Sequence, residues 1–120
     1  MMQRMVPVGD RNQLIAQMRR GALEYCVLAQ LEGSQRYGLE IVKALAEEDG
    51  MVTSEGTMYP LLSRLRRDQL VATTWQESQT GPPRRYYRLT AKGGTALRDF
   101  RNEWRRFSNA VDRILGGATQ

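Results

Sequence analysis

Arginine is the side chain whose number and spacing in this sequence point most clearly to chemistry. Lysine and arginine number 18 against 13 aspartate and glutamate residues, which gives a formal net charge of +5 at pH 7. Arg64 and Arg67 lie close together, and Arg84 and Arg85 are adjacent. Because a guanidinium forms paired hydrogen bonds with phosphate oxygens, we expect a polyanionic partner. Charge alone does not distinguish DNA from RNA or an acidic membrane surface, so the elements that position these arginines must decide.

The sequence lacks the residue combinations that are common in hydrolytic active sites and in transition-metal sites. There is no histidine, which removes the commonest general base, every Ser-His or Cys-His nucleophile pair and the usual transition-metal ligand. Glu47, Glu48 and Asp49 are adjacent, and adjacent carboxylates do not share a helical face. The single cysteine, Cys26, lies in an apolar run and is interpreted as a small buried side chain. We therefore expect neither an enzyme, nor a cofactor, nor a metal site.

Length and hydropathy limit the class of protein. With 120 residues the chain has room for one domain of ordinary size. No apolar run approaches the roughly 18 residues that a membrane-spanning helix requires. Residues 1–10 also lack the apolar core of a signal peptide. These features predict a cytoplasmic protein with no membrane partner.

The spacing of apolar residues predicts three helices in the first half of the chain. Residues 1–11 show no periodic pattern and are expected to form a flexible arm. Apolar residues then recur at helical spacing over 12–31 and again over 37–48. Ser54 is a favourable N-cap for a third, amphipathic helix over 55–68. These helices precede a change in the pattern.

After residue 68 the pattern becomes extended. Residues 70–76 are rich in valine, threonine and tryptophan and predict a strand, and residues 85–89 predict the returning strand. The segment 77–84 between them contains glycine and two prolines and predicts a turn. Arg84 and Arg85 are therefore expected at the tip of a stiff hairpin, where a phosphate backbone can meet them.

A long final helix is predicted over 91–115, capped by Thr90 and followed by a tail over 116–120. Its apolar residues recur at alternating spacings of three and four, which is a heptad pattern. A helix over 12–31 that is apolar on two sides and this heptad stripe cannot both be buried in one short chain. We therefore expect a homodimer. Its predicted interface residues are Leu97, Phe100, Trp104, Phe107, Val111 and Ile114.

The order of three helices, a hairpin and a long helix predicts a mainly α fold with a β-hairpin wing. This is a winged helix-turn-helix over 12–90, followed by a C-terminal dimerisation helix over 91–115. In such a fold the third helix enters the major groove of DNA and the wing contacts the backbone. The candidate DNA-binding residues of the third helix lie off its apolar stripe. They are Ser54, Thr57, Tyr59, Arg64 and Arg67.

Five separated motifs in this order resemble those of the PadR family of bacterial transcriptional regulators. They begin at Arg20, at Tyr37 and at Ser54, and continue with Gly81 to Arg85 and Tyr86 to Gly93. The resemblance covers residues 19–115. It implies a homodimer that binds an inverted-repeat operator in double-stranded DNA and represses transcription until a small molecule releases it. It also adds Tyr37 to the candidate DNA-binding residues.

The short length and single C-terminal helix resemble the smaller PadR subfamily. In that subfamily a tryptophan of the last helix can stack on flat aromatic effectors at the dimer interface. Trp104 stands at the matching position, with Phe100 one turn before it. The alternative for Trp104 is plain packing in the heptad stripe. Trp75 is expected to pack between the hairpin and the helices.

Two other readings of the sequence stay open. One is a winged-helix module that binds a protein and not DNA, because a fold does not determine a function. Loss of binding at raised salt would favour DNA over this alternative. The other is a MarR-like regulator with a different dimer topology, which the position of the heptad stripe after the wing disfavours.

Overall fold

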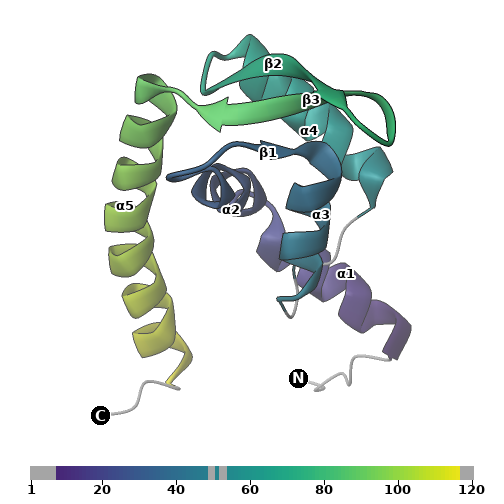
Figure 1. The fold of residues 1–120 in the computed structure, drawn as a ribbon. Helices are drawn as coiled ribbons and strands as arrows, with labels where there is room; N and C mark the ends of the chain where they lie inside the picture. The colour runs from purple at the N-terminus through teal and green to yellow at the C-terminus, as the bar shows by residue number, and fades with distance from the viewer. Residues whose placement is uncertain (1–7, 49–50, 52–53, 117–120) are drawn as a thin grey trace.

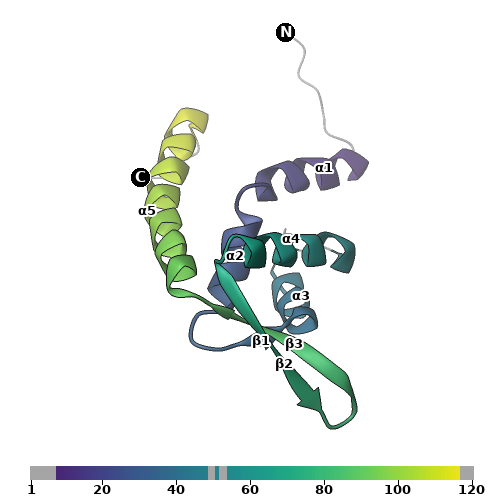
Figure 2. The same cartoon turned by 90° about the horizontal axis from the view of Figure 1, so that it is seen from above.

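The computed structural model describes residues 8–48, 51 and 54–116, and in these residues it shows helices packed around a small antiparallel sheet (Figures 1 and 2). The helices are α1 (Val8–Arg19), α2 (Leu23–Gln30), α3 (Gly38–Ala46), α4 (Glu55–Arg67) and α5 (Ala91–Leu115). The strands are β1 (Arg36–Tyr37), β2 (Val71–Ser78) and β3 (Gly81–Leu89), in the spatial order β1-β3-β2. The predicted mainly α fold with a hairpin wing and a long last helix is confirmed. None of these described helices is both long and apolar enough to cross a membrane.

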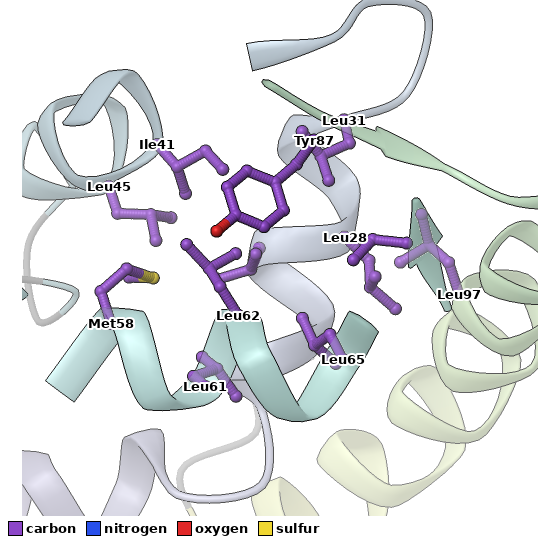
Figure 3. Close-up of a cluster of buried hydrophobic side chains, with 12 residues drawn as sticks. Leu28, Leu31, Ile41, Leu45, Met58, Leu61, Leu62, Leu65, Tyr87 and Leu97 are labelled. Atoms are coloured by element: carbon purple, nitrogen blue, oxygen red, sulfur yellow. The ribbon is translucent and has the colours of Figure 1, made fainter. Parts of the chain in front are cut away.

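The core forms where α2, α3 and α4 meet the sheet and the start of α5. Figure 3 shows apolar side chains converging from these elements, with the ring of Tyr87 among them. α4 contributes four of them at helical spacing, namely Met58, Leu61, Leu62 and Leu65. The apolar stripe predicted for this helix is therefore the buried face, and the opposite face of α4 is free to meet a partner.

The helix predicted over 12–31 is divided into α1 and α2. Gly21 lies between them with φ at 87°, in the left-handed region that glycine adopts without steric cost. α1 begins at Val8, so residues 8–11 are helical and not part of an arm, whereas residues 1–7 lie outside the described residues. The apolar spacing runs through the bend because a change at one φ angle leaves the residue pattern on either side intact.

The second predicted helix begins one residue later than expected, because Arg36 and Tyr37 form the strand β1. These residues pair with Tyr87 and Tyr86 of β3. The backbone amide of Tyr37 donates to the carboxylate of Glu40 at 3.0 Å, which fixes the start of α3. A strand of this length is too short to show alternation, so the sequence did not predict it.

The turn predicted over 77–84 is too long. β2 extends to Ser78 and β3 begins at Gly81, so only residues 79–80 connect the strands. The two prolines at 82–83 fit inside β3 because β1 pairs farther along the strand and the ladder with β2 shifts register here. The hairpin is therefore longer than expected, and its tip lies before the arginines.

The start of α5 depends on a close approach at Gly93. The hydroxyl of Thr90 accepts a hydrogen bond from the Gly93 amide at 2.9 Å, which confirms the predicted cap. A Cβ at Gly93 would collide with the carbonyl oxygen of Leu70 and lie 2.8 Å from Leu89 Cδ1. Glycine is required here because it lets α5 pack directly against the sheet.

Gly93→Ala is therefore expected to destabilise the protein by about 1–3 kcal/mol, the usual cost of forcing an extra carbon into a packed site. Urea unfolding monitored by circular dichroism measures the change. Gly94→Ala is the matched control, since its Cβ would make an ordinary 3.9 Å contact with Leu89. The control is expected to be neutral or stabilising by up to about 1 kcal/mol. Equal effects of the two substitutions would contradict the packing role of Gly93.

Candidate nucleic-acid interface

The first turn of α4 is organised by Ser54 and Thr57. The Ser54 hydroxyl oxygen accepts a hydrogen bond from the Thr57 amide at 3.2 Å, and Ser54 Oγ lies 3.2 Å from Thr57 Oγ1. The predicted N-cap is thus confirmed. Both side chains remain exposed, so they hold the helix end in shape and stay accessible to a partner.

The arginines of α4 lie in two different environments. Arg64 Nη2 lies 3.1 Å from the carboxylate of Glu24 on α2, so the charge predicted to face DNA is partly neutralised by its own chain. Arg67 is exposed and, with Ser63 and Arg66, lines a shallow hollow on the outer side of α4. These three residues form the polar outer face of the helix.

Arg66 did not appear among the sequence-based candidates. It follows Tyr59 by seven residues, which is two helical turns, so the two side chains lie on the same flank of α4. That spacing was a signal in the sequence. Arg66 and Arg67 together give α4 two adjacent exposed cations at its C-terminal end.

The arginines of the wing lie midway along the hairpin and not at its tip. Arg84 pairs across the hairpin with Gln76, and Arg85 pairs with Trp75. The guanidinium carbon of Arg84 lies 4.4 Å from the centroid of the Tyr37 ring, and that of Arg85 lies 4.8 Å from the Trp75 ring. The predicted position at the tip is therefore wrong, because cross-strand pairing places both residues between the tip and the base of the hairpin. The ring of Tyr37, at the start of α3, also holds the Arg84 side chain.

Trp75 also differs from expectation. Its side chain is 63% exposed and does not fill the space between the hairpin and the helices. The ring instead forms a flat surface for Arg85, its cross-strand partner on β3. Burial therefore does not explain the tryptophan at this position.

Tyr59 of α4 faces the start of α3. A Cβ at Gly38 would lie 2.6 Å from Tyr59 Cε1, so this glycine makes room for the ring. Partial burial raises the pKa of Tyr59, and the charges of Glu55 and Tyr87 raise it further. The Tyr59 hydroxyl thus stays protonated at neutral pH and can donate a hydrogen bond to an anion.

Residues of the wing, of α3 and of α4 line one hollow of about 200 Å³ between the wing and the starts of α3 and α4. Its lining includes Tyr37, Gly38, Tyr59, Arg84 and Arg85. Figures 1 and 2 both place the wing tip and the N-terminal end of α4 on the side of the molecule away from α5. Four of the candidate DNA-binding residues are thus brought together beside the wing.

The stripe predicted for the dimer interface divides along α5. Leu97 is 2% exposed and belongs to the core of its own protomer. Phe100 is half-buried and stacks on Tyr25 of α2, with ring centroids 4.2 Å apart. Phe107 and Ile114, by contrast, are 63% and 83% exposed. Only the part of the stripe after Phe100 offers an unpartnered apolar surface.

Trp104 lines a groove of about 640 Å³ between α5 and the bend that joins α1 to α2. Phe100 and Phe107 lie on either side of Trp104, with ring centroids 5.7 and 6.3 Å away. Arg20 and Arg106 also line the groove. Trp104 is 46% exposed, so the single protomer leaves its ring open to solvent. Plain core packing, the alternative for Trp104, does not describe its surroundings within one protomer.

Metal and thiol chemistry find no support in the described residues. In residues 8–48, 51 and 54–116 no three histidine, cysteine, aspartate or glutamate side chains are grouped as metal ligands. Cys26 is only partly buried and not fully buried as expected, and this burial raises the pKa of its thiol, which keeps the thiol protonated at neutral pH. Glu47 and Glu48 are exposed, and Asp49 lies outside the described residues.

Comparison with known proteins gives one consistent result. The chain matches the Transcriptional regulator PadR-like family over residues 27–99. It is 31% identical over 101 residues to Transcriptional regulator Rv3488 of Mycobacterium tuberculosis, covering 84% of this chain and 90% of that protein. A PadR family transcriptional regulator from Eggerthella lenta DSM 2243 has a TM-score of 0.80 at 34% identity, covering 89% of this chain and 93% of the other. A PadR-like regulator from Bacillus cereus has a TM-score of 0.75 at 36% identity, covering 85% and 99%.

Proposed function

The chain belongs to the PadR-like family of transcriptional regulators, which bind DNA, and we propose that it acts as a symmetric homodimer on an inverted-repeat operator. In this proposal α4 of each protomer enters the major groove of one half-site, and the wing contacts the adjacent backbone. The observation that carries it is the hollow beside the wing, where Arg84 and Arg85 of β3 meet Tyr59 of α4. A phosphate contact at this place would hold α4 in register with the base pairs.

The unpartnered apolar residues of α5 support a second copy of the chain as the partner. Large apolar side chains are exposed along this helix and also on α1. They are Trp104, Phe107, Ile114 and Leu115 of α5, and Leu14 and Met18 of α1. A monomer rarely leaves so many large apolar side chains in water unless they form an interface. The half-buried Val111 belongs to the same stripe of α5, and a two-fold dimer buries that stripe from both copies.

The affinity for short mixed-sequence duplex DNA, measured at several salt concentrations, tests the DNA-binding proposal. The logarithm of the association constant is expected to fall linearly with the logarithm of salt, with a slope of about 0.9 for each phosphate neutralised. A winged-helix module that binds only proteins predicts no affinity for the duplex at any salt concentration. An affinity that does not change with salt would also contradict the proposal.

Regulation is proposed to act through the groove at Trp104. We propose that the protein represses transcription and that a planar aromatic molecule, stacked on Trp104, releases the DNA. The flanking rings of Phe100 and Phe107 offer an apolar surface. Arg20 favours a ligand with a negative group, whereas Arg106 lies 3.5 Å from Glu103, which also lines the groove. Because α5 also belongs to the proposed dimer interface, a bound ligand can favour one spacing of the two wings over another.

Ligand binding is expected to quench or shift the fluorescence of Trp104. The chain has two tryptophans, so Trp75→Phe leaves Trp104 as the only source of this emission. A panel of planar aromatic compounds with and without a carboxylate provides the titration, and the same ligand is expected to lower the affinity for DNA. Unchanged emission across the panel, or equal binding by Trp104→Ala measured calorimetrically, would contradict the effector proposal.

A further inference from the structure

Trp75 lies outside the core, yet it forms a close contact with a cation at the wing. We infer that the hollow beside the wing binds one phosphate group of the DNA backbone and that Trp75 is a positioning residue for Arg85 in that contact. This inference rests on the proposed function, because duplex DNA supplies the phosphate. It adds a role for Trp75 that neither the arginine pattern nor the core assigns.

The two wing arginines are held by rings and not by acids. Arg84 lies over the ring of Tyr37, and Arg85 lies over the ring of Trp75. Within the described part of the chain, neither forms an ion pair with a carboxylate. Arg64 and Arg101 differ, because Glu24 and Glu32 neutralise them. The wing therefore keeps two unneutralised cations in fixed places.

One buried nitrogen of Arg85, its Nε atom, has no hydrogen-bond acceptor in the described part of the chain. A buried donor without an acceptor is unfavourable, and an acceptor brought by a ligand removes that cost. A phosphate oxygen is such an acceptor. The unsatisfied donor and the stacking of both cations on rings therefore favour an anion from outside the chain.

Stacking on a ring prepares a guanidinium for phosphate. The ring contacts the flat face of the group, which leaves the N–H donors around its edge available for a forked pair of hydrogen bonds. The ring also restricts the side chain before DNA arrives, so less conformational freedom is lost on binding. Trp75 thus acts on DNA through Arg85.

The hollow has the size and lining of a phosphate site. A volume of about 200 Å³ holds several water molecules, each of which takes about 30 Å³ in the liquid. Gly38 and Leu39, the first residues of α3, border it, and the first amides of a helix have no acceptor within the helix. Tyr59 adds a hydroxyl that is protonated at neutral pH. These groups donate hydrogen bonds, as an anion requires.

The test compares the affinity of Trp75 variants for short mixed-sequence duplex DNA at several salt concentrations. Trp75→Ala leaves both arginines in place and is expected to weaken binding roughly two- to fivefold per protomer, the effect of one exposed cation–π contact. Trp75→Phe keeps a ring and is expected to retain most of the affinity. Thr74→Ala is the matched control, because Thr74 is the exposed neighbour of Trp75 on β2 and has no ring on which an arginine can stack. It is expected to bind like the parent protein.

A double-mutant cycle separates positioning from a general effect on the wing. In protein that already carries Arg85→Ala, Trp75→Ala is expected to cause no further loss, because its partner is gone. Equal losses in both backgrounds, or parental affinity in Trp75→Ala, would overturn the inference while the parent still binds DNA. If the parent itself binds no DNA, the proposed function fails and this inference fails with it.

In a Trp104→Phe protein, the fluorescence emission of Trp75 is expected to change when DNA is added. Constant emission would also overturn the inference.

Discussion

Replacing Arg84 and Arg85 together by alanine is expected to reduce the affinity for duplex DNA at least about 100-fold, since each guanidinium forms charge-assisted hydrogen bonds with phosphate. In a dimer the substitution removes two cations from each protomer. The slope of the salt dependence is then expected to flatten by up to about 0.9 for each phosphate that the variant no longer neutralises. Fluorescence anisotropy of a labelled duplex at several salt concentrations measures both quantities. The reduction is expected for every DNA sequence, because an arginine bound to phosphate does not read bases.

The control for this variant removes the same charge at a distant place. Arg98 and Arg113 are exposed on α5, and their replacement by alanine lowers the net charge equally. This control is expected to change the affinity only slightly, since long-range charge effects are screened over about 8 Å at physiological ionic strength. Similar reductions in the two variants would show that net charge, and not the hollow beside the wing, produces the binding. An unchanged affinity in the wing variant would place the DNA surface elsewhere.

Phe107→Asp combined with Ile114→Asp is expected to convert the proposed dimer into a folded monomer. Both side chains are largely exposed in the protomer, so a carboxylate at either position costs the isolated chain little. In a two-fold interface the same substitutions place four charges in an apolar contact, which is strongly unfavourable. Sedimentation velocity reports the mass, and circular dichroism reports whether the helices remain.

The choice of positions decides whether that experiment reports assembly or folding. Phe100 stacks on Tyr25 within the protomer, so Phe100→Asp is expected to disturb the fold as well. Asn109→Asp is a suitable control, because Asn109 is an exposed polar residue of the same helix. A Phe107 and Ile114 variant that sediments as a dimer would refute the proposed interface on α5.

The elements that are determined by residues close together in the sequence could be predicted from the sequence. The stripe Met58, Leu61, Leu62 and Leu65 predicts both the helix and its buried face, because the helical period places these residues on one side. The cap at Ser54 follows from the side chain itself. The change to an extended pattern after residue 68 and the heptad spacing over 91–115 likewise predicted the wing and the long last helix, which the structure contains.

The features that sequence reasoning missed depend on contacts between distant segments. The bend at Gly21 leaves the apolar pattern unchanged, so the pattern predicted one helix where there are two. Arg84 was expected at the wing tip, but its position is decided by cross-strand pairing and by the ring of Tyr37. Leu97 belongs to the heptad pattern, yet the close approach of α5 to the sheet at Gly93 places it in the core.

Arg64 shows the same limitation for the candidate site. Its place on α4 suggested contact with DNA, but Arg64 Nη2 lies 3.1 Å from the carboxylate of Glu24, which belongs to another helix. A partner that is 40 residues away in sequence leaves no local signal. Trp75 is the opposite case, because the hydrophobic character of tryptophan suggested packing, whereas the structure shows it exposed beside a cation.

Selection of bound duplexes from a random pool, followed by sequencing, tests the central claim most directly. A symmetric dimer with α4 in two major grooves is expected to enrich an inverted repeat whose half-site centres are separated by about one helical turn, roughly 10 base pairs, or a multiple of it. The enrichment is expected to disappear in the Phe107 and Ile114 double variant, which retains a single DNA-binding surface. Enrichment of no sequence, or of a single half-site without a symmetric partner, would contradict a dimeric DNA-binding regulator of this design.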